Sequence, residues 1–162
     1  MKKILSYIIA GLITMSFVSC QQGEREDKNG NTPSSVVEKM YQAVNNNDFE
    51  TAVSYNKFPD TIKIAPKKDE NMYEQFKNNQ KDKDGKYIIL REEWISFIIK
   101  QMKENVDYSL ESWEIISEEI SNTDPNSAQV KTKIHIKKNG EETVTDSSFP
   151  LKREDGVWLI IG

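Results

Sequence analysis

Apolar side chains recur with a helical period in the first half of the chain and alternate in the second half. Thr32 and Pro33 suit the N-cap and the first position of a helix, and the apolar residues of 36–44 then fall on one stripe. Asparagine side chains compete for backbone hydrogen bonds, so the run 45–47 predicts the end of this helix. Asp48 can cap a short second helix that presents Phe49 to the core.

A third helix is predicted over residues 94–106. Its apolar side chains repeat at helical spacing and need cover on more than one side: Trp94, Ile95, Ile98, Ile99, Met102 and Val106. Residues 63–85, which precede this helix, are very polar. We expect a mobile insert there, with one turn of helix that carries Met72, Tyr73 and Phe76.

After Asn105 the apolar period changes from that of a helix to that of a strand. Residues 108–120 predict one long strand whose apolar side chains change face near Ile115, so we expect a bulge or bend there. Residues 130–137 alternate apolar side chains with lysine and histidine, as a half-buried strand does. Asp124-Pro125-Asn126 predicts the turn between the two strands.

Two further strands complete the predicted sheet. Asn139-Gly140 indicates a hairpin, and the strand after it spans about 142–151, where Pro150 indicates an edge or a strand end. Asp155-Gly156 predicts a second hairpin before a last strand, 157–161. Helices followed by an antiparallel meander define an α+β domain, in which N-terminal helices pack in a bent antiparallel sheet of about four strands.

The first twenty residues have the composition of an export signal. Lys2 and Lys3 precede an uncharged apolar run, 4–18, which is followed by Ser19 and Cys20. The run is shorter than the ~20 residues that span a bilayer, which disfavours the alternative of an uncleaved helical anchor. The sequence therefore predicts a signal peptide over residues 1–19 and an exported protein.

The segment Phe17-Val18-Ser19-Cys20 resembles a bacterial lipobox. That resemblance implies cleavage before Cys20, attachment of lipid to this residue, and a membrane as the first partner. The expected location is the outer membrane of a Gram-negative bacterium. Residues 21–31 carry no apolar side chain, so we expect 20–31 to be a flexible tether to a single domain, 32–162.

An acidic cluster lies early in this tether: Glu24, Glu26 and Asp27. It is similar to the acidic tracts that direct some lipoproteins to the cell surface, and it is our candidate for a surface-export signal. A charged run is also typical of a solvated linker, which is the alternative.

Composition limits the partners and the chemistry. The chain has 162 residues, a formal net charge of −4 and one cysteine. A mildly acidic surface does not favour nucleic acid as a partner. With lipid on Cys20, no disulfide or thiolate nucleophile is available. The single histidine, His135, lies on the lysine face of its strand, so we expect no catalytic residue, metal site or cofactor. The segment 82–85 is similar to part of a calcium loop but lacks the closing glutamate, so we expect a tight turn.

Three segments carry a resemblance to a known family: Pro33-Ser34-Ser35-Val36-Val37, Asn47-Asp48-Phe49-Glu50-Thr51-Ala52 and Asp155-Gly156-Val157-Trp158-Leu159-Ile160. They resemble the cystatin-like or nuclear transport factor 2-like lipoproteins, many of which are domains of unknown function. The resemblance covers about 32–162 and implies a bent sheet wrapped around helices as a cone with an open mouth. We expect a non-catalytic domain that binds a ligand in the cone. The alternatives are a homodimeric or partner-binding scaffold that uses the sheet face, and an isomerase-like enzyme.

Five aromatic residues are the candidates for lining such a cone: Tyr41, Tyr55, Trp94, Trp113 and Trp158. Large aromatic side chains pack in the core by default. At the mouth of the cone they would form a wall for a small apolar molecule or a sugar. An isomerase would also need a buried carboxylate, for which Asp146 is the nearest candidate.

Overall fold

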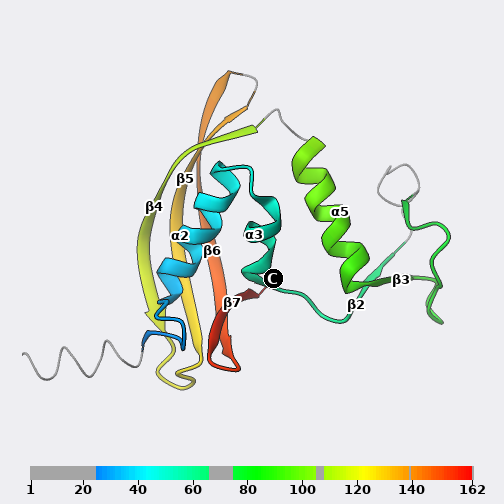
Figure 1. Cartoon of the computed structure of the whole chain (residues 1–162), viewed down its shortest axis with the longest axis horizontal. Helices are drawn as coiled ribbons and strands as arrows, with labels where there is room; N and C mark the ends of the chain where they lie inside the picture. Colours follow the sequence, from blue (N-terminus) through cyan, green and yellow to red (C-terminus); the bar gives the residue numbers. More distant parts are fainter. Residues whose placement is uncertain (1–24, 66–74, 105–107, 139, 162) are drawn as a thin grey trace, which may run out of the picture.

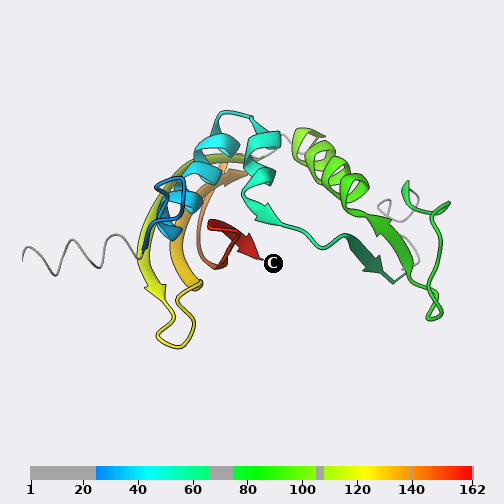
Figure 2. The same ribbon diagram turned by 60° about the horizontal axis from the view of Figure 1, so that its bottom comes forward.

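The computed structural model describes residues 25–65, 75–104, 108–138 and 140–161, so the predicted signal peptide, Cys20 and Glu24 lie outside the described residues. The described chain is an α+β structure in which an antiparallel sheet curves around helices (Figure 1). The fold class predicted from the sequence is confirmed. Figure 2 shows the curvature of the sheet around its helices and a second, smaller group of elements beside it.

The main sheet has five strands, one more than the sequence indicated, in the order β1-β7-β6-β5-β4. The long strands are β4 (Tyr108–Ile120), β5 (Ser127–Lys138) and β6 (Glu141–Glu154), and β7 (Val157–Ile161) follows them. These four pair antiparallel. The additional strand is β1 (Asn56–Lys57), two residues that pair parallel to β7 at the edge of the sheet.

Two helices lie against the sheet as the capping pattern predicted. In α2 (Pro33–Asn45) the hydroxyl of the N-cap residue Thr32 accepts a hydrogen bond from the Ser35 backbone. In α3 (Phe49–Ser54) the Asp48 carboxylate accepts from the Thr51 backbone. Helix α2 packs on β4, β5 and β7.

The predicted bend of β4 is a pair of register irregularities. They lie between Leu110 and Ser112 and between Ile115 and Ser117. Each one changes which residues face the helices. Leu110, Trp113, Ile115 and Ile120 therefore all pack against the core despite their mixed spacing, while Ile116 points outward and is 51% exposed. Ile116 and Ile120 therefore lie on different faces, because Ile116 is the extra residue at the second irregularity.

The structure describes both central residues of only one of the two predicted hairpin turns. Asp155 and Gly156 both have positive φ, the conformation that a two-residue hairpin needs, so this prediction is confirmed. Asn139 of the other hairpin lies outside the described residues. Pro150 does not end its strand: it lies within β6, paired with Gln129 of β5. Because the pairing of β6 with β7 begins only at Leu151, the proline meets the ladder on one side.

Two short strands flank the predicted polar insert, 63–85, and the first of them extends into it. A separate two-stranded sheet pairs β2 (Thr61–Ile64) with β3 (Tyr87–Leu90), and α5 (Arg91–Glu104) follows β3 directly. We call β2, β3 and α5 the hairpin unit, and α2 with β4–β7 the sheet unit. Phe76 is buried in the hairpin unit, whereas Met72 and Tyr73 lie outside the described residues.

Each unit has its own buried cluster. In the sheet unit the cluster comprises Val36, Val37, Tyr41, Ala128, Val130, Ile134, Leu151, Trp158 and Ile160. In the hairpin unit it comprises Phe76, Tyr87, Ile89 and Phe97. Helix α5 packs on α3, β2 and β3, and most of its predicted apolar stripe is only half-buried. Neighbouring elements therefore bury less of the apolar surface of α5 than the sequence predicts.

The described part of the predicted tether, residues 25–31, is packed on the sheet unit. The Asp27 side chain is 7% exposed and accepts hydrogen bonds from the backbone N–H groups of Asn29, Asn31 and Trp158, at 2.8, 2.9 and 3.2 Å. The Trp158 indole donates to the Arg25 carbonyl at 2.9 Å. The polar composition of residues 25–31 predicts a flexible linker. In the structure, polar groups of this segment form hydrogen bonds with the domain instead.

Candidate functional site

A cleft of about 760 Å³ lies between the two units. It is bounded by the turn from α2 to α3, by the C-terminal half of α5 and by the first residues of β4. Its apolar lining consists of Val44, Phe49, Phe97, Ile98, Met102 and Leu110. Its polar lining consists of Asn45, Asn47, Gln101, Lys103 and Ser109.

The cleft exists because some apolar side chains of α5 pack in the hairpin unit while others line the cleft. Phe97 is buried in the core of the hairpin unit, and Ile98 packs beside it. Met102, one turn further along the helix, is half-buried and lines the cleft. Across the cleft, Val44 and Phe49 are also half-buried. The walls thus carry apolar surface that neither core covers.

One ion pair bridges the two walls. The Lys103 ammonium lies 2.7 Å from a carboxylate oxygen of Glu50, which belongs to α3. The hydrogen bond from Lys103 lowers the pKa of Glu50. Both side chains are more than half exposed, so the pair lies at the solvent edge of the cleft and contributes little to stability.

The described lining offers no arrangement for acid–base catalysis. It contains one charged side chain, Lys103, and no carboxylate or histidine. Asp146, the carboxylate singled out from the sequence, is exposed on the outer face of β6, opposite Lys133. His135 is exposed, as its place on the lysine face predicted. Among the described residues there is no group of three or more side chains arranged to hold a metal ion.

The segment 82–85, considered for calcium, forms a turn in the structure. The Asp82 carboxylate accepts hydrogen bonds from the backbone N–H groups of Asp84 and Lys86, at 2.9 and 3.0 Å, and Gly85 has positive φ. The hydrogen bond from Lys86 and the ion pair with Lys63 lower the pKa of Asp82. Its oxygens are therefore engaged by the backbone of the turn and by Lys63 of β2.

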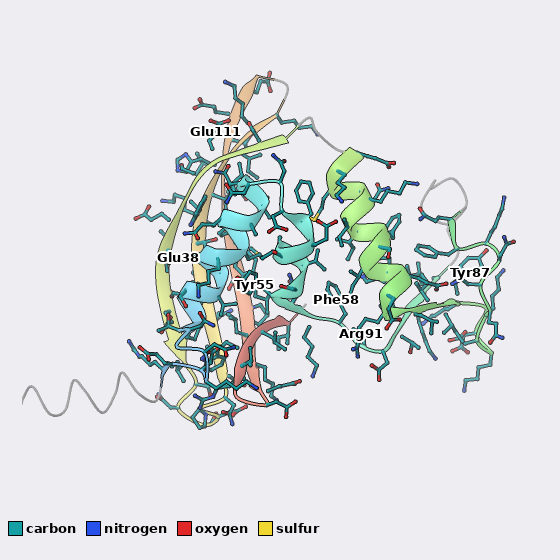
Figure 3. The ribbon with its side chains drawn as sticks, viewed as in Figure 1. Glu38, Tyr55, Phe58, Tyr87, Arg91 and Glu111 are labelled. Carbon is teal, nitrogen blue, oxygen red and sulfur yellow. The ribbon has the colours of Figure 1, made fainter. Side chains whose placement is uncertain are left out.

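None of the five aromatic residues proposed as pocket lining borders this cleft. Trp158 and Tyr41 belong to the core of the sheet unit, and Tyr55 and Trp113 pack against it. Trp94 packs against the core of the hairpin unit. Figure 3 shows Tyr55 beside α3 and Phe58 between the two units. Two aromatic side chains do line the cleft. The sequence pattern assigned Phe49 to the apolar face of its helix, whereas Phe97 was not part of the predicted stripe of the third helix.

Tyr41 and Thr132 form a buried polar contact in the sheet unit. The tyrosine hydroxyl lies 3.1 Å from the threonine hydroxyl, and Thr132 is 1% exposed. Burial raises the pKa of Tyr41, and the hydrogen bond with Thr132 opposes this rise. The pair holds α2 on β5, which positions the turn that forms one wall of the cleft.

Glu118 has a structural role that its sequence neighbourhood did not indicate. Its carboxylate accepts a hydrogen bond of 2.8 Å from the Ser34 backbone, in the first turn of α2. A carboxylate at a helix N-terminus satisfies an otherwise unpaired N–H group and interacts favourably with the helix dipole. Glu118 therefore joins the end of β4 to the start of α2, far from the cleft.

No protein-family model matches the sequence, and a search of curated proteins found no match. Solved structures similar to this chain include an NTF-2 like protein of unknown function from Shewanella oneidensis MR-1, with 13% identity and a TM-score of 0.48, covering 79% of this chain and 91% of that one. A candidate NTF2-like transpeptidase from Campylobacter jejuni has 14% identity and a TM-score of 0.45, covering 82% and 99%.

A third similar structure is a candidate polyketide cyclase from Pseudomonas putida KT2440, with 15% identity and a TM-score of 0.41, covering 81% of this chain and 87% of that one. At these identities and TM-scores we carry no activity over from any of the three. In the part of the chain that the structure describes, every helix is too short or too polar to cross a bilayer.

Proposed function

We propose that the chain is a lipid-anchored envelope protein whose domain binds a small, largely apolar molecule in the cleft between α3, α5 and β4. The cleft carries this proposal, because its walls expose apolar side chains from both units around a volume of about 760 Å³. That volume lies in the range of small-molecule sites, which are mostly apolar with a few polar groups that orient the ligand. Asn45, Asn47 and Gln101 supply such polar groups here.

Binding rather than catalysis is the function that the lining favours. A general base must lie within hydrogen-bond reach of the proton it removes. The described lining offers only the Lys103 ammonium, which the Glu50 carboxylate engages. The lining also lacks tryptophan, so an apolar ligand suits it better than a sugar that stacks on an indole ring.

The anchor is the second part of the proposal, and it rests on the sequence of residues 1–20. Cys20→Ala should abolish incorporation of labelled lipid and release the protein from the membrane fraction, since the thiol is the attachment point. Retention of the variant in membranes would contradict the anchor. For export to the cell surface, Glu24 and Glu26 are the residues to test, because the Asp27 carboxylate binds the folded domain.

Native mass spectrometry of the mature chain, purified from its own membrane in mild detergent, tests the cleft. A bound ligand gives a mass difference between the native and the denatured protein, whereas covalent lipid is present in both. We expect such a difference in the unaltered protein. A ligand-free monomer would overturn the proposal, and a ligand-free dimer would favour the scaffold alternative.

Two variants on α5 locate the ligand. Met102→Trp fills the cleft and should remove the mass difference. Lys100→Trp places the same side chain at an exposed position of the same helix, outside the cleft lining, and should leave the difference unchanged. Equal ligand loss in both variants would contradict binding in the cleft.

A further inference from the structure

The packing of residues 25–31 has a consequence for how the domain sits on a membrane. Arg25, the first described residue, is five residues after Cys20. A fully extended chain covers at most about 3.6 Å per residue, so the backbone of Arg25 lies within about 18 Å of the anchored residue. Because the Arg25 carbonyl accepts a hydrogen bond from the Trp158 indole, this short connection limits the position of the whole sheet unit.

One end of the sheet unit is gathered around this segment. The Lys28 backbone donates to the Gly156 carbonyl at 2.8 Å, which binds the segment to the turn between β6 and β7. The Arg153 backbone donates to the Asn126 carbonyl at 2.7 Å, and its guanidinium donates to the Glu26 carbonyl at 3.4 Å. The segment and the turns β4–β5 and β6–β7 therefore form one bonded end, which we call the anchor end.

The cleft lies at the opposite end of the sheet unit. Strand β4 runs from the cleft, which Ser109 and Leu110 line, to Glu118, which bonds to the first turn of α2. Eight residues of strand between Leu110 and Glu118 correspond to about 25 Å. Figure 1 shows the same arrangement, with the start of the described chain at the lower end of β4 and the junction of α2 with α3 at the upper end.

We propose that the anchor end faces the lipid bilayer and that the cleft lies on the side of the domain distant from it, an orientation set by the short anchor connection and the packed segment 25–31. This inference rests on the proposed lipid anchor at Cys20. Charge does not supply the orientation, because the anchor end carries residues of both signs. The basic ones are Arg25, Lys28 and Arg153, and the acidic ones are Glu26, Asp27, Asp124 and Asp155. The orientation should therefore be independent of the anionic lipid content of the membrane.

The test anchors the protein chemically, so that it does not depend on lipidation in the cell. Because Cys20 is the only cysteine, the chain 20–162 can be coupled through its thiol to a maleimide lipid in nanodiscs. Gadolinium chelated to a fraction of the lipid headgroups then attenuates the amide NMR signals of nearby residues. We expect at least twofold stronger attenuation at Lys28, Asn126 and Gly156 than at Asn47 and Gln101.

Two changes should abolish the difference in NMR attenuation between the anchor end and the cleft. Asp27→Ala removes the acceptor that holds the segment, while Glu26→Ala, at the exposed neighbour, is the matched control and should retain the difference. A ten-residue glycine-serine insertion after Gln22 lengthens the connection without altering a described residue. Equal attenuation of both ends in the unaltered chain would overturn the proposal, as would an attenuation pattern that appears only with anionic lipid.

The outcomes are separable from those of the anchor proposal. Suppose that Cys20→Ala stays membrane-bound in cells while the coupled chain shows the expected attenuation pattern. The proposal of a lipid anchor is then wrong, but the preferred orientation of the chemically anchored domain stands. If Cys20→Ala is released and the coupled chain shows no preference, the anchor stands and the orientation is wrong.

Discussion

The sheet unit buries its apolar side chains more completely than the hairpin unit does. In the sheet unit, Val37, Val130 and Trp158 are completely buried, and a polar segment from outside the predicted domain covers the tryptophan. In the hairpin unit only Ile89 reaches that level among the described residues, and every described residue of the predicted α5 stripe is partly exposed. The comparison indicates that stability resides in the sheet unit, whereas the cleft arises where the two cores do not merge.

Uneven packing of this kind suits a binding site. Apolar surface that is not consumed by the core remains available to a ligand, and the elements that carry it are held by fewer buried contacts. Helix α3 connects the two units, since it packs on both α2 and α5. Figure 2 shows how far β2 and β3 extend from the sheet, which leaves α5 as the part of the hairpin unit that faces α3. A ligand in the cleft would add apolar contacts to a junction that has few of its own.

The largest expected effect comes from removing the central side chain of the sheet unit. Trp158→Ala should lower the free energy of unfolding by about 4 kcal/mol, since it leaves a cavity in a completely buried site. Trp94→Ala, in the half-buried aromatic group of the hairpin unit, should cost about 1–2 kcal/mol. Urea unfolding measures both values.

Hydrogen exchange of the same two variants sharpens the comparison. Trp94→Ala should accelerate amide exchange in β2, β3 and α5 while β5 stays protected, because the two clusters are separate. Trp158→Ala should accelerate exchange throughout. A uniform increase in the Trp94→Ala variant would contradict the division into two units and would indicate a single cooperative core.

An intermediate effect is expected from Asp27, which joins residues 25–31 to the sheet unit. Burial alone would raise the pKa of Asp27, but hydrogen bonds from the backbones of Asn31, Asn29 and Trp158 and from the Asn31 side chain outweigh this effect and lower it. A carboxylate with a lowered pKa stabilises the fold above its unfolded pKa of about 3.9. That stabilisation is lost as the pH falls through the folded pKa.

Asp27→Asn isolates this contribution. The variant should be less stable by about 2 kcal/mol at neutral pH, because charge-assisted hydrogen bonds are lost, and it should lose less stability than the unaltered chain between pH 5 and pH 2. Other carboxylates with lowered pKa values, such as Asp124, titrate in both proteins and cancel in the comparison. Stability curves of equal slope in the two proteins would show that Asp27 is not bonded as described.

Local signals in the sequence predicted most of the sheet unit. Thr32, Asp48 and the pair Asp155-Gly156 act through side-chain or backbone preferences within a few residues, and each forms the cap or turn expected of it. The bounds of β4 were also predicted, because alternation begins and ends there. The irregularity near Ile115 follows from the change in which residues are apolar.

The remaining features depend on partners that are distant in sequence. Asp27 was predicted to lie in a flexible tether, since no local pattern shows that its acceptor oxygens would meet the Trp158 backbone. The strand β2 has only four residues, and its partner β3 is separated from it by a long polar segment. The cleft depends on how far α5 packs from β4, which the helix periodicity does not specify.

The smallest expected effect concerns the buried hydroxyl pair of the sheet unit. Tyr41→Phe removes one partner and leaves the Thr132 hydroxyl buried without the other, which should cost about 1–2 kcal/mol. Thr132→Val alone should cost a similar amount for the same reason. The double variant replaces both polar groups with apolar ones and should be less destabilised than the sum of the single variants by about 1 kcal/mol. Additive losses, measured by urea unfolding of all four proteins, would show that the two hydroxyl groups do not interact, and α2 would then be held on β5 by apolar packing alone.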